Sequence, residues 1–172
     1  ATFELNTWLS GNHDTTRTSM SLLLYNLGKY PEVQQKVFDE MKTLLGDSDR
    51  EITEQDVNQL SYLDLVIKES LRVFSPVTMV ARKLQSEKRV GDFVFPKDSE
   101  IMICLNLMMK NPKYFDDPLT FNPDRFLNLE TMPLAYSAFS IGARKCIGGK
   151  FATTMLKIVV VKVLTRFTIK LP

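Results

Sequence analysis

The chain has 172 residues, of which 44% are hydrophobic and 24% are charged, a composition typical of one globular domain. Its formal net charge of +2 is too small to indicate a nucleic-acid partner. Two cysteines exclude a disulfide framework and favour a reducing, intracellular setting, and there is no run of about 18 apolar residues that would span a membrane. Because the sequence opens with Ala, inside a predicted helix and without a signal peptide, we expect a fragment whose targeting signal lies elsewhere.

The first part of the sequence predicts two helices. Apolar residues recur at helical spacing up to Gly28, with an expected irregularity around Gly11. A second helix begins at Pro31, which suits a first-turn position, and Gly46 provides its stop.

Two further helices follow a polar loop at residues 47–51. Thr53 is suited to cap a short helix that ends near Leu60. Ser61 is then expected to cap a longer helix, whose end is set by Pro76.

The next segments are short and rich in β-forming residues. Residues 80–85, 93–95 and 100–105 predict strands, and a turn at residues 96–98 joins the last two. Cys104 lies in the last segment, where we interpret it as a small apolar strand residue.

Residues 110–135 contain four prolines and are expected to be mostly irregular. Residues 151–167 predict a helix that is apolar around much of its girth, with Lys157 and Lys162 as exceptions, and such a helix is buried within a domain. The predicted fold class is therefore mainly α with a small β section. Many apolar faces have no evident partner within the sequence, which supports the interpretation as a fragment.

A lone cysteine precedes the last predicted helix, in the stretch SIGARKCIGGKF. Cys146 could be a buried filler, a redox thiol, a nucleophile or a metal ligand. A helix N-terminus and the nearby Arg144 and Lys145 favour its thiolate form. Gly142 and Gly148 leave room for close approach of a flat group, so the surroundings suit a thiolate ligand of haem iron.

From Phe139 onward the stretch reads Phe-x-x-Gly-x-Arg-x-Cys-x-Gly, and it resembles the haem-binding signature of the cytochrome P450 family at every fixed position. The resemblance implies that Cys146 is the axial iron ligand of haem b (iron protoporphyrin IX), that Arg144 helps to bind a haem propionate, and that Phe139 packs near the sulfur. It also assigns Gly142 and Gly148 to the cofactor-binding loop.

Glu69 and Arg72 lie three residues apart on a predicted helix, within reach of an ion pair. Most such pairs are solvated, but apolar neighbours on this helix argue against free exposure. In the P450 family a Glu-x-x-Arg pair joins an arginine from a later Pro-x-Arg-Phe segment, which residues 123–126 resemble. The resemblance implies a structural triad of Glu69, Arg72 and Arg125 beneath the cysteine loop.

The stretch GNHDTT, residues 11–16, is a third polar set. A metal-binding His-Asp pair would need further histidines, and His13 is the only one in the sequence; a solvated helix face is the simpler alternative. The P450 family carries (Ala/Gly)-Gly-x-(Asp/Glu)-Thr-(Thr/Ser) here, on the helix that crosses the distal face of the haem. The resemblance implies that Thr15 holds a water or dioxygen and that Asp14 helps to deliver protons. Asn12 departs from the family's glycine, which bears on oxygen activation and on the shape of the pocket.

Arg82 lies after the Glu-x-x-Arg helix, where the family places a strand arginine in contact with a haem propionate. A surface arginine is the alternative. Residues 77–80 match a region that touches substrate in the family, and their apolar character fits a lipophilic substrate or plain core equally.

The resemblance extends over residues 1–172 and implies the C-terminal portion of a single cytochrome P450 catalytic domain, from the distal helix through the cysteine-loop helix. It implies a monooxygenase that inserts one oxygen atom from O2 into a lipophilic small molecule, with electrons from NADPH through NADPH–cytochrome P450 reductase and possible help from cytochrome b5. The motif His-Asp-Thr-Thr at residues 13–16 resembles the animal and insect fatty-acid ω-hydroxylase branch of the family. The implied location is the cytosolic face of the endoplasmic reticulum membrane, through an N-terminal anchor outside this sequence.

Two other functions remain open. One is a haem-thiolate isomerase or rearranging enzyme that needs neither O2 nor a reductase, which the Asp14–Thr15 pair disfavours. The other is a haem-binding protein with impaired oxygen activation, which Asn12 favours.

Overall fold

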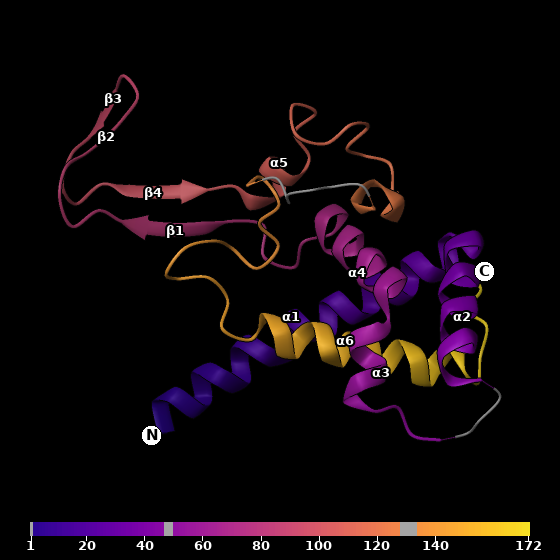
Figure 1. Cartoon of the computed structure of the whole chain (residues 1–172). Coiled ribbons are helices and arrows are strands. Elements are labelled where there is room, and N and C mark those ends of the chain that lie inside the picture. The colour runs from indigo at the N-terminus through magenta and orange to yellow at the C-terminus, as the bar shows by residue number, and fades with distance from the viewer. Residues whose placement is uncertain (1, 47–49, 128–133) are drawn as a thin grey trace.

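The computed structural model describes residues 2–46, 50–127 and 134–172, and within them the protein is mostly helical with two small β sheets (Figure 1). The elements have these bounds: α1 Thr2–Lys29, α2 Pro31–Leu45, α3 Glu54–Gln59, α4 Ser61–Val73, β1 Val80–Lys83, β2 Lys88–Val90, β3 Phe93–Phe95, β4 Glu100–Ile103, α5 Leu105–Met109, the 3₁₀ helix η1 Pro123–Phe126 and α6 Gly149–Leu164. The predicted fold class is confirmed. Positions 47–49 of the expected polar loop and 128–133 of the expected irregular segment lie outside the described residues.

Helix α4 lies at the centre of the helical part, and α1, α2 and α6 pack against it (Figure 1). The side chains on their contact faces form one apolar core. Burial of these apolar side chains away from water is the main force that holds the helices together. Residues of this core that are almost fully buried include Leu23, Leu27, Val37, Leu60, Leu63, Val66, Ile67, Leu156 and Val160.

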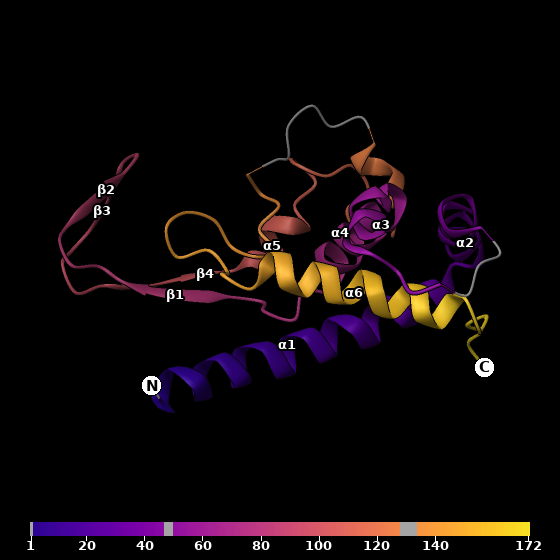
Figure 2. The same ribbon diagram turned by 60° about the horizontal axis from the view of Figure 1, so that its bottom comes forward.

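Helices α1 and α6 lie together at their C-terminal ends and diverge toward their N-terminal ends (Figure 2). Leu27 of α1 and Leu164 of α6 are buried, whereas Leu5 and Leu9 of α1 are 63% and 66% exposed. Phe151, in the first turn of α6, is 48% exposed. Helix α6, which the sequence predicts to be buried within a domain, is buried or half-buried along most of its length in the described structure, and its exposed residues are Lys150, Phe151, Met155 and Lys162.

Helix α1 is continuous, so the expected irregularity around Gly11 is not observed. The hydroxyl of Thr15 donates to the carbonyl of Gly11 at 2.6 Å, and the hydroxyl of Ser19 donates to the carbonyl of Thr15 at 2.8 Å. In such back-bonding a side-chain hydroxyl is a second donor to a helical carbonyl, and α1 stays continuous through both of these bonds. Among the helices that the structure describes, none has the length and apolarity needed to cross a membrane.

The ends of α2 and the start of α3 agree with the sequence. Pro31 occupies the first turn of α2, and Gly46 ends this helix with φ +64°, which glycine adopts without strain. Thr53 caps α3 in a reciprocal capping box with Asp56, in which each side chain accepts from the other's backbone N–H. The Arg50 guanidinium, together with the Thr53 donors, holds the pKa of Asp56 well below its usual range.

Ser61 does not cap α4, contrary to expectation, because it is the first residue of the helix and Leu60 precedes it as N-cap. The carboxylate of Glu40 on α2 caps α4 instead. Its oxygens accept from the backbone N–H groups of Tyr62 and Leu63 at 2.6 and 2.9 Å, and from the Ser61 hydroxyl at 3.0 Å. A carboxylate at this position also interacts favourably with the helix dipole.

The β section extends away from the helices (Figure 1). Strand β1 pairs antiparallel with β4, from Val80 opposite Ile103 to Lys83 opposite Glu100, and β2 pairs with β3 in a separate hairpin. Strands β1 and β4 are each shorter than the predicted ranges 80–85 and 100–105, whereas β3 has the predicted bounds. Strand β2 was not predicted.

Two short helices were also not predicted. Cys104 follows β4 and is the N-cap of α5, so its interpretation as a strand residue was wrong. The segment after α5 is irregular apart from η1, as expected for the residues that the structure describes.

Candidate functional site

The segment that carries Cys146 is a tight loop in front of α6. The N–H of Cys146 donates to the carbonyl of Phe139 at 2.8 Å, and the N–H of Lys145 donates to the carbonyl of Gly142 at 3.1 Å. Gly142 has φ +82°, a left-handed conformation that a side chain would strain. Backbone hydrogen bonds and this glycine therefore define the position of Cys146.

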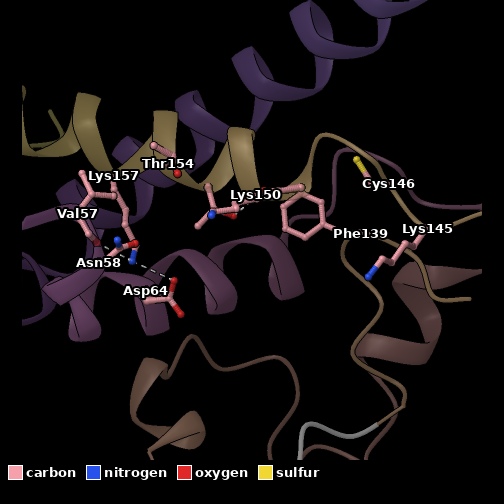
Figure 3. A pocket seen from close by; sticks show the side chains of 11 residues that line it. Val57, Asn58, Asp64, Phe139, Lys145, Cys146, Lys150, Thr154 and Lys157 are labelled. Carbon is pink, nitrogen blue, oxygen red and sulfur yellow. Dashed lines mark hydrogen bonds and ion pairs between the residues drawn. The ribbon is translucent and has the colours of Figure 1, made fainter. Parts of the chain in front are cut away.

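The ring of Phe139 lies beneath the first turn of α6 (Figure 3). A Cβ atom on Gly149 would lie 3.2 Å from Cγ of this ring, so a larger residue there would require the ring to shift. A Cβ on Gly148 would lie 3.9 Å from Sγ of Cys146, which is ordinary contact. Sequence reasoning missed Gly149, although the Gly-Gly pair before the helix was its signal.

The thiol of Cys146 is free and exposed, and it lies near the Phe139 ring in front of α6 (Figure 3). Apolar side chains flank it on the same segment: Ile147 is 93% exposed, and Phe151 and Met155 are also exposed. Within residues 2–46, 50–127 and 134–172 there is no group of three or more His, Cys, Asp or Glu side chains that could hold a metal ion.

Glu69, Arg72 and Arg125 lie together, the first two fully buried and the third with a side chain 10% exposed. Arg72 donates to Glu69 through Nε at 2.7 Å and through Nη2 at 2.9 Å. Arg125 donates from Nε to the same carboxylate at 3.0 Å. The backbone N–H of Asn122 adds a fourth donor to Glu69 at 2.9 Å.

The two guanidinium groups also bind the backbone of the segment that follows α5. Arg72 donates to the carbonyls of Met109, Pro118 and Thr120, which together with Glu69 use all five of its N–H groups. Arg125 donates to the carbonyls of Asp116, Asp117 and Thr120. A segment without regular secondary structure is thus held to α4 by charge-assisted hydrogen bonds.

Asp14 and Thr15 lie on α1, and their side chains have different hydrogen-bond and ion-pair partners. Asp14 is exposed, with its carboxylate 3.1 Å from Nδ1 of His13 and 3.6 Å from Nη2 of Arg17. Thr15 donates to Gly11 as described above, which leaves the lone pairs of its oxygen available as acceptors. Within the described chain no hydrogen bond joins either residue to the Cys146 loop.

Arg82 and Arg144 are exposed. Arg82 lies on β1 and donates from Nη1 to the carbonyl of Ala81 at 2.8 Å, whereas Arg144 lies in the Cys146 loop. The structure does not bring the two guanidinium groups into contact with each other.

A pocket of about 400 Å³ lies between α6 and the start of α4, and Phe139, Cys146 and three lysines line it (Figure 3). Lys157 is buried and donates to the carbonyl of Val57 at 3.2 Å, with Asp64 at the same distance. Burial raises the pKa of the Asp64 carboxyl, but Lys68 and Lys157 outweigh burial, so the pKa lies below its usual value. Lys145 and Lys150 contribute further positive charge at the exposed end of the pocket.

Comparison with known proteins shows the family of this chain. A family model described as Cytochrome P450 matches residues 2–172. "Probable cytochrome P450 4d20" of Drosophila melanogaster is 39% identical over 173 residues, which cover 98% of this chain and 34% of that protein. "Cytochrome P450 4V2" is 40% identical in Mus musculus and 38% identical in Homo sapiens, covering 97% of this chain and 32% of each relative. The chain belongs to the cytochrome P450 family and spans about one third of the length of these relatives.

The family is one of haem-thiolate enzymes that hold haem b, and the residues present fit that group. The required features are a free thiol, an apolar surface for a flat macrocycle and basic side chains for its propionates. Cys146 supplies the thiol, and exposed apolar residues lie beside it and on the diverging half of α1. Two exposed arginines, Arg82 and Arg144, supply the basic side chains.

Proposed function

We propose that this chain is the haem-binding, C-terminal part of one cytochrome P450 catalytic domain that acts as a monooxygenase. The observation that carries the proposal is the exposed, free thiol of Cys146, held in a glycine-shaped loop between apolar surfaces. When bound, thiolate-ligated haem supplies the activation of O2 for insertion of one oxygen atom into a lipophilic substrate.

The residues of the cysteine loop bind and orient the cofactor in this proposal. Cys146 ligates the iron, and Arg144 and Arg82 neutralise the propionates through charge-assisted hydrogen bonds. Phe139 packs near the sulfur, while Gly142 and Gly148 allow the loop to approach the macrocycle closely.

Asp14 and Thr15 supply the proton chemistry on the opposite side. The free lone pairs of the Thr15 oxygen can accept a hydrogen bond from a water, because its own proton is donated to Gly11. Asp14 is exposed, so it can exchange protons with bulk water and pass them toward that site.

The triad of Glu69, Arg72 and Arg125 has a structural role in this proposal. It fixes the segment after α5 on α4, and α4 in turn packs against α6, which follows the cysteine loop. It does not take part in the chemistry.

The proposed partners are NADPH–cytochrome P450 reductase, with cytochrome b5 as a possible second electron donor. Lys145 and Lys150 present positive charge next to the cysteine loop and suit an acidic protein surface. The His-Asp-Thr-Thr motif at residues 13–16 resembles the animal and insect fatty-acid ω-hydroxylase branch, so the proposed substrate is lipid-like and the proposed location is the cytosolic face of the endoplasmic reticulum membrane.

A reconstitution assay tests the proposed activity. The full-length protein is combined with reductase and NADPH, and products are measured with fatty acids, steroids and xenobiotics in air and under argon. A monooxygenase forms product only with both NADPH and O2. Product formed without either would instead indicate a rearranging enzyme, and NADPH consumption without product would indicate impaired oxygen activation, the alternative that Asn12 favours.

A further inference from the structure

A row of polar side chains runs along one face of α1, through Asn12, Thr15, Thr16 and Ser19. The row continues the face that carries the buried Leu23, at the spacing of successive helical turns. This face packs on α4 and α6 where the helices meet. Asn12 therefore shares a helix face with the buried Ser19 and Leu23, and it lies in the N-terminal half of α1. In this half α1 diverges from α6 (Figure 2).

The amide group of Asn12 is held in one orientation. The hydroxyl of Thr16 donates to Oδ1 of Asn12 at 3.0 Å, and both side chains are partly buried. With its oxygen engaged, the amide presents Nδ2 and its two protons on the other side. These protons reach no acceptor in the part of the chain that the structure describes.

We propose that Asn12 is a hydrogen-bond donor to a small polar or anionic ligand bound opposite Cys146, and that Thr16 positions it for this role. The inference rests on the proposed function, because the ligand site is the haem face opposite the proximal thiolate. The proposed role of Asn12 makes the site selective among ligands. The site favours ligands with an acceptor atom near Asn12 and has less room for bulky apolar ligands.

The chemistry of a carboxamide decides the class of ligand. Asn12 is neutral and contributes donors alone at Nδ2, so it stabilises an acceptor atom or an anion and offers nothing to a cation. A hydrogen bond to a charged partner is worth more than one between neutral groups, so an anionic probe is the most sensitive test.

The test uses the full-length haem protein and two probes, potassium cyanide for the ferric form and carbon monoxide for the reduced form. Asn12→Asp keeps the size and the acceptor for Thr16 but replaces both donors, and Asn12→Gly removes the side chain. Thr18→Gly, on an exposed position of the same helix, is the control for a glycine in α1. The proposal predicts that both Asn12 variants bind cyanide about tenfold more weakly.

The carbon monoxide complex gives a second readout that does not depend on affinity. A donor near the bound oxygen atom lowers the C–O stretching frequency, so both Asn12 variants are expected at higher frequency than wild type and Thr18→Gly. Thr16→Val frees the amide and is expected to broaden the band.

Each result has one meaning. If the reduced wild type with carbon monoxide lacks the red-shifted Soret band of a thiolate-ligated haem, the proposed function fails and the inference fails with it. If this band is present but cyanide affinity and C–O frequency are the same in wild type, Asn12→Asp and Asn12→Gly, the role of Asn12 alone is overturned.

Discussion

Replacement of Glu69 by Gln tests the buried triad most sharply. The Glu69 carboxylate accepts four hydrogen bonds, two from Arg72, one from Arg125 and one from the backbone of Asn122. Gln has the same size, but its charge is absent and one of its two acceptors becomes an N–H₂ donor that faces guanidinium donors. Two buried cations then share one neutral oxygen.

The expected destabilisation follows from the burial of these groups. Glu69 and Arg72 are 0% exposed and the Arg125 side chain is 10% exposed, so water cannot replace the lost partner. Removing one member of a buried ion pair costs about 3–5 kcal/mol. This loss is a large share of the roughly 5–15 kcal/mol by which proteins are stable.

Urea unfolding of the full-length protein, followed by far-ultraviolet circular dichroism, measures this effect. Glu87→Gln is the matched control, because Glu87 is exposed and an exposed charge contributes within about 0.5 kcal/mol. A loss below about 1 kcal/mol in Glu69→Gln would refute the view that this carboxylate holds the segment after α5 in place.

Three further changes have defined outcomes. Gly149→Ala puts a methyl group 3.2 Å from the Phe139 ring and is expected to lower the free energy of unfolding by about 1–3 kcal/mol; an unchanged urea midpoint would show that the ring moves aside freely. Glu40→Gln removes the charged cap of α4 and is expected to cost about 1 kcal/mol in the same assay, and no loss would mean that water caps the helix equally well. Because the pKa of Asp56 is lowered in the folded state, first by Arg50, its stabilisation is present above the unfolded pKa of about 3.9 and is lost as the pH falls through the lower, folded pKa. Wild type is therefore expected to lose more stability than Asp56→Asn between pH values of about 5 and 2, and parallel losses would contradict the assignment.

Local sequence rules predicted those parts of the fold that neighbouring residues determine. Pro31 and Gly46 bound α2, and Thr53 caps α3, because each acts on backbone groups within a few residues. The spacing of Glu69 and Arg72 placed them on one helix face, and the structure brings Arg125 to the same carboxylate.

The features that sequence reasoning missed depend on contacts between distant residues. Ser61 is a plausible cap by local rules, yet the carboxylate of Glu40 reaches α4 from another helix and takes its place. The sequence showed Lys157 only as a polar exception on an apolar helix, whereas in the structure Asp64 and the Val57 carbonyl provide partners for it in the interior. The pairing of β1 with β4, rather than of β3 with β4, likewise depends on chain topology.

The central claim is that Cys146 is the iron ligand, and one spectrum tests it directly. The full-length protein is reduced in the presence of carbon monoxide, and the Soret band is compared among wild type, Cys146→Ala and Cys104→Ala, the last being the control for loss of a free thiol. The account predicts the red-shifted band of a thiolate-ligated haem in wild type and Cys104→Ala and its loss in Cys146→Ala. Retention of the band in Cys146→Ala, or a wild-type band at the position typical of histidine ligation, would contradict it.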